Sequence, residues 1–155
     1  MSELLPNLKE MISVSGLSGY EGPICDLIED AWKPLTDELK RSRIGSLYGL
    51  HQGCGDEPRP SILMAAHMDA IGLMVAGIED GFLRRSKVGG LDHRVLPGQL
   101  VIVHGRQDLR GVVVQPPAHL LPPEVSSGPV PVAHLVGDTG LSHRAGGRLV
   151  RWGDG

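Results

Sequence analysis

A histidine and an aspartate stand two residues apart in the stretch SILMAAHMDAIGLMV, residues 61–75, directly after a short apolar run. Residues i and i+2 of an extended chain face the same side, so His67 and Asp69 can face one site. A neutral imidazole is a good ligand for Zn²⁺ or Co²⁺. A neighbouring carboxylate can accept a hydrogen bond from the other ring nitrogen and thereby fix the tautomer. The spacing makes His67 a candidate metal ligand and Asp69 its supporting acid.

The pair alone does not decide between a metal site and a histidine that satisfies polar groups at the end of a strand. A metal site needs three or more protein ligands, and the rest must come from elsewhere. The other histidines lie in turn-rich sequence or in β-type runs and show no His-x-x-x-His spacing. We expect them to be surface or turn residues: His51, His93, His104, His119, His134 and His143.

Two further motifs have ordinary structural explanations. Asp138-Thr139-Gly140 matches the tripeptide of aspartic proteases, but those enzymes need two such loops, and Asp, Thr and Gly also form common turns. GLSGYEG, residues 16–22, precedes a helical pattern and could suggest a phosphate site. Glu21 would repel a phosphate and instead suits the positive end of the helix dipole. We expect both motifs to be connections.

The elements that must position His67 and Asp69 begin with two amphipathic helices. Apolar residues recur at helical spacing over residues 3–14, and a second apolar stripe follows Pro23, which suits a first helical turn. Residues 41–50 are expected to form a strand with a glycine irregularity. SILMAA, residues 61–66, is too short for a helix and too apolar for a half-exposed strand, which predicts a central buried strand of an α/β sheet. The end of such a strand is where α/β folds place their chemistry.

The pattern changes after His67. Apolar runs on both sides of residues 79–81 predict a β-hairpin, because Asp-Gly readily adopts positive φ angles. Short β-type runs follow, separated by glycine turns and by a proline-rich loop at 116–131; they are QLVIVHG, RGVVVQ and VAHLVG. Closely spaced short strands favour a small antiparallel barrel. We therefore divide the chain near residue 70, into an α/β segment (1–70) and a β-module (71–155).

The composition excludes several classes of protein. The 155 residues are 41% hydrophobic with a net charge of −3, which is typical of one or two small globular domains and not of a nucleic-acid-binding protein. The apolar runs are shorter than the ~20 residues of a membrane span, and residues 1–9 lack a secretory signal. The two cysteines do not make a disulfide framework, so we expect a reducing cytoplasm.

The order of the motifs resembles that of the M42 family of metal-dependent aminopeptidases, which includes glutamyl aminopeptidases and the tetrahedral TET peptidases. The matching segments cover essentially the whole chain: GLSGYEG (16–22), PLTDE (34–38), IGSL (44–47), AAHMDAIGLMV (65–75), DGFLR (80–84), VGGLDHRVLPGQLV (88–101), GVVVQPPAHLL (111–121) and VGDTG (136–140). Ala70 departs from the family pattern, since many relatives have glutamate there.

The resemblance implies an α/β catalytic domain that is interrupted by an inserted small antiparallel β-barrel domain. Residues 1–70 would be the start of the catalytic domain and 71–155 the inserted domain that helps subunits assemble, with the C-terminal half of the catalytic domain absent. The implied function is cytoplasmic hydrolysis of N-terminal residues from peptides by two divalent metal ions, Zn or Co. His67 would bind one metal ion, and Asp69 would be the catalytic-site acid that supports it.

The family's remaining metal ligands follow the inserted domain, so we expect the 155-residue chain alone to be inactive. The implied partners are peptide substrates and copies of the same chain, in dimers or a dodecamer, and neither nucleic acid nor membrane. The alternative hypothesis is a non-catalytic module that self-associates through the β-barrel domain. A third is a hydrolase of another class, but the sequence shows no carboxylate pair of the glycosidase kind.

Overall fold

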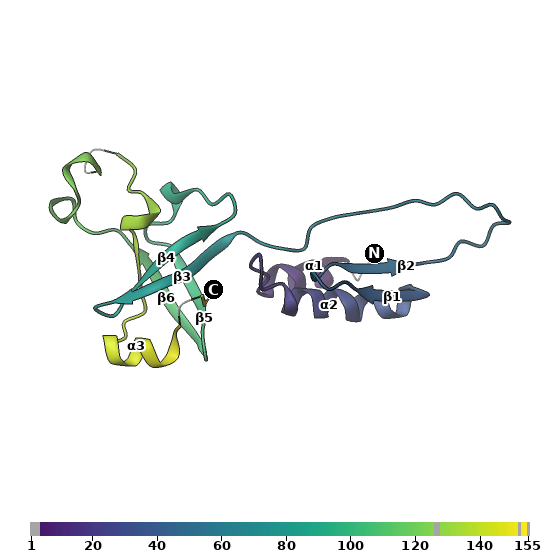
Figure 1. Cartoon of the computed structure of the whole chain (residues 1–155), viewed down its shortest axis with the longest axis horizontal. Helices are drawn as coiled ribbons and strands as arrows, with labels where there is room; N and C mark the ends of the chain where they lie inside the picture. Colours follow the sequence, from purple (N-terminus) through teal and green to yellow (C-terminus); the bar gives the residue numbers. More distant parts are fainter. Residues whose placement is uncertain (1–3, 126–127, 152, 155) are drawn as a thin grey trace. The chain divides into compact units, whose positions relative to one another are not determined.

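The computed structural model describes residues 4–125, 128–151 and 153–154, and the chain divides into two compact units (Figure 1). The first unit is Met1–Ala70 and the second is Ile71–Gly155.

Two helices and one hairpin make up the ordered elements of the first unit. Helix α1 spans Leu4–Ser13 and helix α2 spans Gly22–Trp32, followed by the 3₁₀ turn Lys33–Leu35. Pro23 lies in the first turn of α2, where the missing N–H costs no hydrogen bond, and Pro34 lies in the 3₁₀ turn that ends the helical segment. The structure thus confirms both predicted helices.

The predicted single strand over 41–50 is wrong, because this stretch is part of a hairpin. Strands β1 (Glu38–Arg41) and β2 (Leu47–Leu50) pair in antiparallel fashion. The turn between them closes through the Ser42 N–H, which donates to the Ser46 carbonyl at 2.8 Å, and Gly45 adopts a φ of 92°. A left-handed backbone conformation favours glycine, so the glycine is the turn residue that separates two strands.

The predicted central strand at 61–66 is also not formed. The segment is extended but unpaired, and its apolar side chains are open to solvent: Ile62 is 89% exposed, Leu63 90% and Met64 90%. A strand exists through hydrogen bonds to a neighbour, and none of the described strands lies beside this segment. Pairing begins only at Ala70, whose N–H donates to the Gly16 carbonyl at 2.7 Å and which forms a parallel bridge with Leu17.

The second unit is built on a five-stranded antiparallel sheet with the strand order β3-β4-β7-β6-β5 (Figure 1). The strands are β3 (Gly72–Glu79), β4 (Phe82–Val88), β5 (Leu100–His104), β6 (Asp108–Val114) and β7 (Val136–Asp138). The β3–β4 hairpin turns at Asp80 (φ 49°) and Gly81 (φ 92°), which confirms the prediction made from Asp-Gly.

Short turns and one helix connect and cover these strands. Four 3₁₀ turns span His93–Val95, Ala118–Leu120, Pro123–Val125 and Val132–His134, and helix α3 spans His143–Leu149. The run VAHLVG, expected to be a strand, is a strand only from Val136, because Pro131 starts a 3₁₀ turn ahead of it. Helix α3 was not expected, since two glycines weaken its helical pattern.

The core of the second unit consists of two apolar clusters. One cluster contains Leu96, Val113, Leu121, Val130 and Leu135, and the other contains Val75, Leu83, Val103 and Val150. Val113 and Leu135 are completely buried. In the part of the chain that the structure describes, no helix has the length and apolar character needed to cross a bilayer.

The last part of the chain bonds to one outer strand of this sheet, β3, and to the residues directly after the other outer strand, β5. The Val75 N–H in β3 donates to the Asp154 carbonyl at 2.7 Å, and the Gly153 N–H donates to the Val75 carbonyl at 2.8 Å. Directly after β5, the Arg106 N–H donates to the Leu149 carbonyl at 2.8 Å. These bonds draw the two edges of the sheet toward one segment and curl the sheet.

Candidate functional site

His67 and Asp69 lie in the first unit and contact each other. The Nδ1 atom of His67 is 3.1 Å from the Asp69 Oδ1 atom and 3.0 Å from the Asp69 carbonyl oxygen. The His67 side chain is 85% exposed and that of Asp69 is 39% exposed. The expected proximity of these two side chains is therefore present in the structure.

The backbone around the pair is held against the start of helix α2. Ala70 pairs with Leu17, and the Ser18 N–H donates to the Ala70 carbonyl at 3.2 Å. Gly16 permits this approach, because a Cβ atom there would lie 2.9 Å from the Ile24 Cγ2 atom and 3.5 Å from the Met68 carbonyl oxygen. The glycine-rich connection thus fixes the chain immediately after Asp69.

This arrangement suits a histidine that binds a metal through its other ring nitrogen. When the Nδ1–H donates to Asp69, the proton is on Nδ1 and the Nε2 lone pair is free for a cation. A carboxylate in this position also holds the imidazole ring in one orientation. The pair can therefore supply one well-oriented imidazole ligand.

The residues present do not complete a metal site. Within residues 4–125, 128–151 and 153–154, no group of three or more His, Cys, Asp or Glu side chains is placed to hold a metal ion. Zinc sites need at least three protein ligands. His67 can fill one ligand position of such a site, and the remaining ligands would have to come from outside these residues.

Contact with a carboxylate does not by itself distinguish His67 from the other histidines. The Nδ1 atom of His104 is 2.9 Å from Asp108 Oδ1 across the β5–β6 turn, and that of His51 is 3.3 Å from Asp37 Oδ2. The His104–Asp108 pair was not expected, although a histidine at the end of one predicted strand and an acid at the start of the next is a sequence signal for it. The side chain of His143 lies outside the described residues.

The two motifs expected to be connections are connections. Gly140 has a φ of 69°, and its N–H donates to Asp138 Oδ1 at 2.8 Å, which is an ordinary aspartate turn. In GLSGYEG, Glu21 occupies the residue before α2, and its Oε1 atom accepts the Gly19 N–H at 2.7 Å. The carboxylate thus bonds to the glycine-rich connection and makes no side-chain hydrogen bond to the N–H groups at the start of α2.

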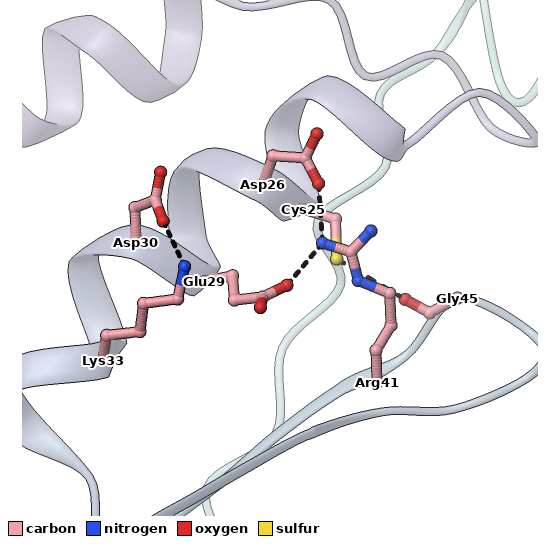
Figure 2. Close-up of polar contacts among 7 residues, drawn as sticks. All are labelled: Cys25, Asp26, Glu29, Asp30, Lys33, Arg41 and Gly45. Carbon is pink, nitrogen blue, oxygen red and sulfur yellow. Dashed lines mark hydrogen bonds and ion pairs between the residues drawn. The ribbon is translucent and has the colours of Figure 1, made fainter.

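A cluster of charges ties the β1–β2 hairpin to helix α2 (Figure 2). The Arg41 Nη2 atom donates to Asp26 Oδ1 at 2.7 Å and to Glu29 Oε2 at 2.6 Å. These two hydrogen bonds raise the pKa of Arg41, and the bond to Asp26 has the larger effect. Beneath them the buried Cys25 thiol donates to the Gly45 carbonyl at 3.8 Å. The cluster joins helix α2 to the β1–β2 hairpin.

Comparison of the sequence with known proteins shows the family of this chain. The model of the M42 glutamyl aminopeptidases matches residues 45–154, a stretch that contains both His67 and Asp69. The chain belongs to the M42 family.

Individual M42 proteins resemble the chain over most of its length. A lysyl aminopeptidase of Pyrococcus furiosus is 38% identical over 116 residues, which is 73% of this chain and 32% of that protein. The crystal structure of a TET aminopeptidase from the marine sediment archaeon Thaumarchaeota archaeon SCGC AB-539-E09 superimposes with a TM-score of 0.87 at 29% identity, covering 99% of this chain and 43% of that one.

A third relative is known as an assembly. The Pyrococcus horikoshii TET1 peptidase, described as assembling into a tetrahedron or a large octahedral shell, has a TM-score of 0.79 and 36% identity, over 97% of this chain and 44% of that chain. The M42 chain described here spans about a third of the length of the lysyl aminopeptidase.

Proposed function

We propose that this M42 chain is the N-terminal part of a metal-dependent aminopeptidase that removes N-terminal residues from peptides. The observation that carries the proposal is the hydrogen-bonded His67–Asp69 pair inside the segment that matches the family. In the complete enzyme His67 would be a ligand of one of two divalent ions, Zn or Co, and Asp69 would orient the imidazole. Bound metal ions would polarise the scissile carbonyl and activate water.

The division of the chain into two units supports two separate roles, one in catalysis and one in assembly. Residues 1–70 would belong to the catalytic domain and residues 71–155 to an inserted β-barrel domain that assembles subunits. The curled antiparallel sheet supports the barrel interpretation, because residues 149–154 bond both to β3 and to Arg106 directly after β5. The reported assembly of the TET1 peptidase supports homo-oligomerisation as the function of this domain.

The 155 residues alone are expected to lack peptidase activity, because the described part contributes one imidazole and one supporting carboxylate to a site that needs more ligands. A non-catalytic, self-associating module is the second candidate function. The separate core of the second unit favours it. A cytoplasmic location is supported by the free thiols of Cys25 and Cys54.

The decisive experiment uses the native protein from its source. Its intact mass is measured, and its hydrolysis of aminoacyl-nitroanilides is followed after chelation and after addition of Co²⁺ or Zn²⁺. We expect activity that chelator abolishes and metal restores, and we expect the recombinant 155-residue chain to be inactive under the same conditions.

The residue assignment is tested in the same protein. His67→Ala should lower metal-restored activity at least about 100-fold, and Asp69→Asn should weaken metal affinity roughly 10- to 100-fold, as is typical for loss of an outer-shell partner. His51→Ala is the matched control, since it also removes an exposed histidine that contacts an aspartate, and it should leave activity unchanged. Activity that survives chelation, or a His67→Ala enzyme with full activity, would contradict the proposal.

A further inference from the structure

The peptide unit between Asp69 and Ala70 is hydrogen-bonded through both of its polar groups. Its carbonyl oxygen, on Asp69, lies 3.0 Å from the Nδ1 atom of His67. Its N–H, on Ala70, donates to the Gly16 carbonyl at 2.7 Å. A peptide unit is planar, so the direction of its N–H fixes the direction of its carbonyl. The bond to Gly16 therefore points the Asp69 carbonyl at the imidazole ring.

One ring nitrogen of His67 thus has two acceptors within reach. Besides the backbone carbonyl at 3.0 Å, the Asp69 Oδ1 atom lies 3.1 Å from the same Nδ1 atom. Neither a carbonyl oxygen nor an ionised carboxylate can donate a hydrogen bond, so both acceptors require the proton on Nδ1. The backbone carbonyl therefore selects the same tautomer as the carboxylate does, and it leaves Nε2 without a proton.

The Gly16 carbonyl is held in place by close packing against helix α2. A Cβ atom on Gly16 would lie 2.9 Å from the Cγ2 atom of Ile24, well inside the usual contact distance of two carbon atoms. Ile24 is buried in the first turn of α2, and a β-branched side chain has one strongly preferred χ1 rotamer in a helix. A side chain on Gly16 would therefore push the connection off the helix and move its carbonyl away from Ala70.

We propose that Gly16 is a positioning residue for His67, because its carbonyl orients the peptide unit that holds the imidazole. The Asp69 carbonyl then keeps the Nε2 atom of His67 free for a divalent cation. We call these two hydrogen bonds the Gly16 relay. Hydrogen bonds that are linked through one peptide polarise and strengthen each other. The inference rests on the proposed function, which makes His67 a metal ligand, and it adds a residue distant in sequence to the support of that ligand.

The tautomer of His67 tests the relay in the absence of metal. NMR of the ¹⁵N-labelled 155-residue chain shows which ring nitrogen of the neutral imidazole carries the proton. We expect the proton on Nδ1 in the unaltered chain and also in Asp69→Ala, which removes the carboxylate but keeps the backbone carbonyl. The double variant Gly16→Ala/Asp69→Ala should show a mixture of both tautomers, because it loses both acceptors. A mixture in the unaltered chain or in Asp69→Ala, or an unchanged tautomer in the double variant, would overturn the inference.

Metal affinity of the native-length enzyme tests the role of the relay. The dissociation constant for Zn²⁺ is measured by competition with a coloured chelator. Gly16→Ala should raise this constant roughly 10-fold or more, which is the usual effect of losing a partner that orients a metal ligand. Gly22→Ala is the matched control, because Gly22 lies in the same connection, has open space around it and has no positive φ. It should leave the dissociation constant unchanged.

A second substitution separates positioning from a general loss of stability. Ile24→Ala removes the Cγ2 atom that a methyl group on residue 16 would meet, but it also leaves a cavity at a buried position. The double variant Gly16→Ala/Ile24→Ala should bind Zn²⁺ more tightly than Gly16→Ala although it unfolds at a lower temperature. A merely structural role of Gly16 predicts the opposite order of affinities.

The two proposals fail in different ways in these experiments. An unchanged dissociation constant in Gly16→Ala, or no recovery in Gly16→Ala/Ile24→Ala, would overturn the positioning role even in an enzyme whose activity depends on metal and on His67. An unaltered native-length enzyme that binds no divalent metal would instead overturn the proposed function, and with it the role of Gly16 in metal binding.

Discussion

At the level of single residues, the side chain that most destabilises the folded state is a buried arginine outside the candidate site. Arg85 lies in β4 opposite Val75 and is 9% exposed, and its Nε, Nη1 and Nη2 atoms have no hydrogen-bond partner in the described structure. Burial lowers the pKa of Arg85 to about 10. A buried charge without a partner destabilises the folded state, because it loses its hydration and gains no replacement.

Replacing this arginine by an apolar residue of similar length should therefore stabilise the protein. We expect Arg85→Met to raise the free energy of unfolding by about 1–3 kcal/mol, the usual cost of a buried unsatisfied group. Arg84→Met is the control, since Arg84 is exposed and bonds to Glu79, and it should change stability by less than about 0.5 kcal/mol. Urea unfolding of both variants measures the difference, and an unchanged or lower stability of Arg85→Met would contradict it.

The same residue predicts a pH dependence at high pH. Because its folded pKa lies below the ordinary arginine value, the unfolded chain binds more protons between about pH 10 and that ordinary value. The contribution of Arg85 to the free energy of unfolding should therefore rise with pH across this window. The difference in free energy of unfolding between the unaltered chain and Arg85→Met should be smaller at pH 11 than at pH 8. A difference that stays constant with pH would argue against a desolvated guanidinium.

At the scale of elements, the β1–β2 hairpin depends on the conformation of one glycine. Gly45 has a φ of 92° and nothing within 4 Å of the position that a Cβ atom would occupy, so any cost of a side chain there is conformational and not steric crowding. The hairpin in turn carries Arg41, which bonds to Asp26 and Glu29 of α2 (Figure 2). A strained turn would thus weaken the packing of the hairpin on the helix.

We expect Gly45→Ala to destabilise the chain by about 1–2 kcal/mol, the usual cost of a left-handed conformation for a residue with a Cβ atom. Gly53→Ala is the control, because Gly53 also has open space around it but no positive φ. It should be neutral or slightly stabilising. Thermal unfolding of the two variants provides the comparison, and equal midpoints would show that the turn tolerates a side chain.

At the scale of the whole molecule, the two units differ in how well they bury apolar surface. The second unit has two apolar clusters of its own. In the first unit many apolar side chains remain exposed, among them Leu4, Leu5, Leu8, Ile12, Ile62, Leu63 and Met64. Apolar surface of this kind marks a region that contacts further polypeptide or aggregates.

Separate expression of the two units tests this contrast. A fragment of residues 71–155 should unfold cooperatively and give the dispersed NMR spectrum of a packed domain, because its core is self-contained. A fragment of residues 1–70 should bind an apolar dye and unfold at a lower temperature than the fragment 71–155. A dispersed spectrum from residues 1–70 together with an unfolded fragment 71–155 would show that the self-contained core belongs to the first unit instead.

Features that depend on near neighbours along the chain could be predicted from the amino-acid sequence. The spacing of apolar residues and the position of Pro23 predicted both N-terminal helices, and Asp80-Gly81 predicted the β3–β4 turn. The i, i+2 spacing and the family resemblance identified His67 and Asp69 as a pair. These features rest on local backbone preferences, which a short stretch of chain fixes without its partners.

Which strands have neighbours depends on the tertiary fold and could not be predicted from local sequence. The apolar run 61–66 satisfies every local criterion for a buried strand, yet it stays exposed because no described strand pairs with it. The placement of β7 between β4 and β6, the burial of Arg85 and the outer position of β5 likewise depend on segments distant in sequence. Strand pairing is a contact between two such segments, and the amino-acid pattern of one strand does not specify the other.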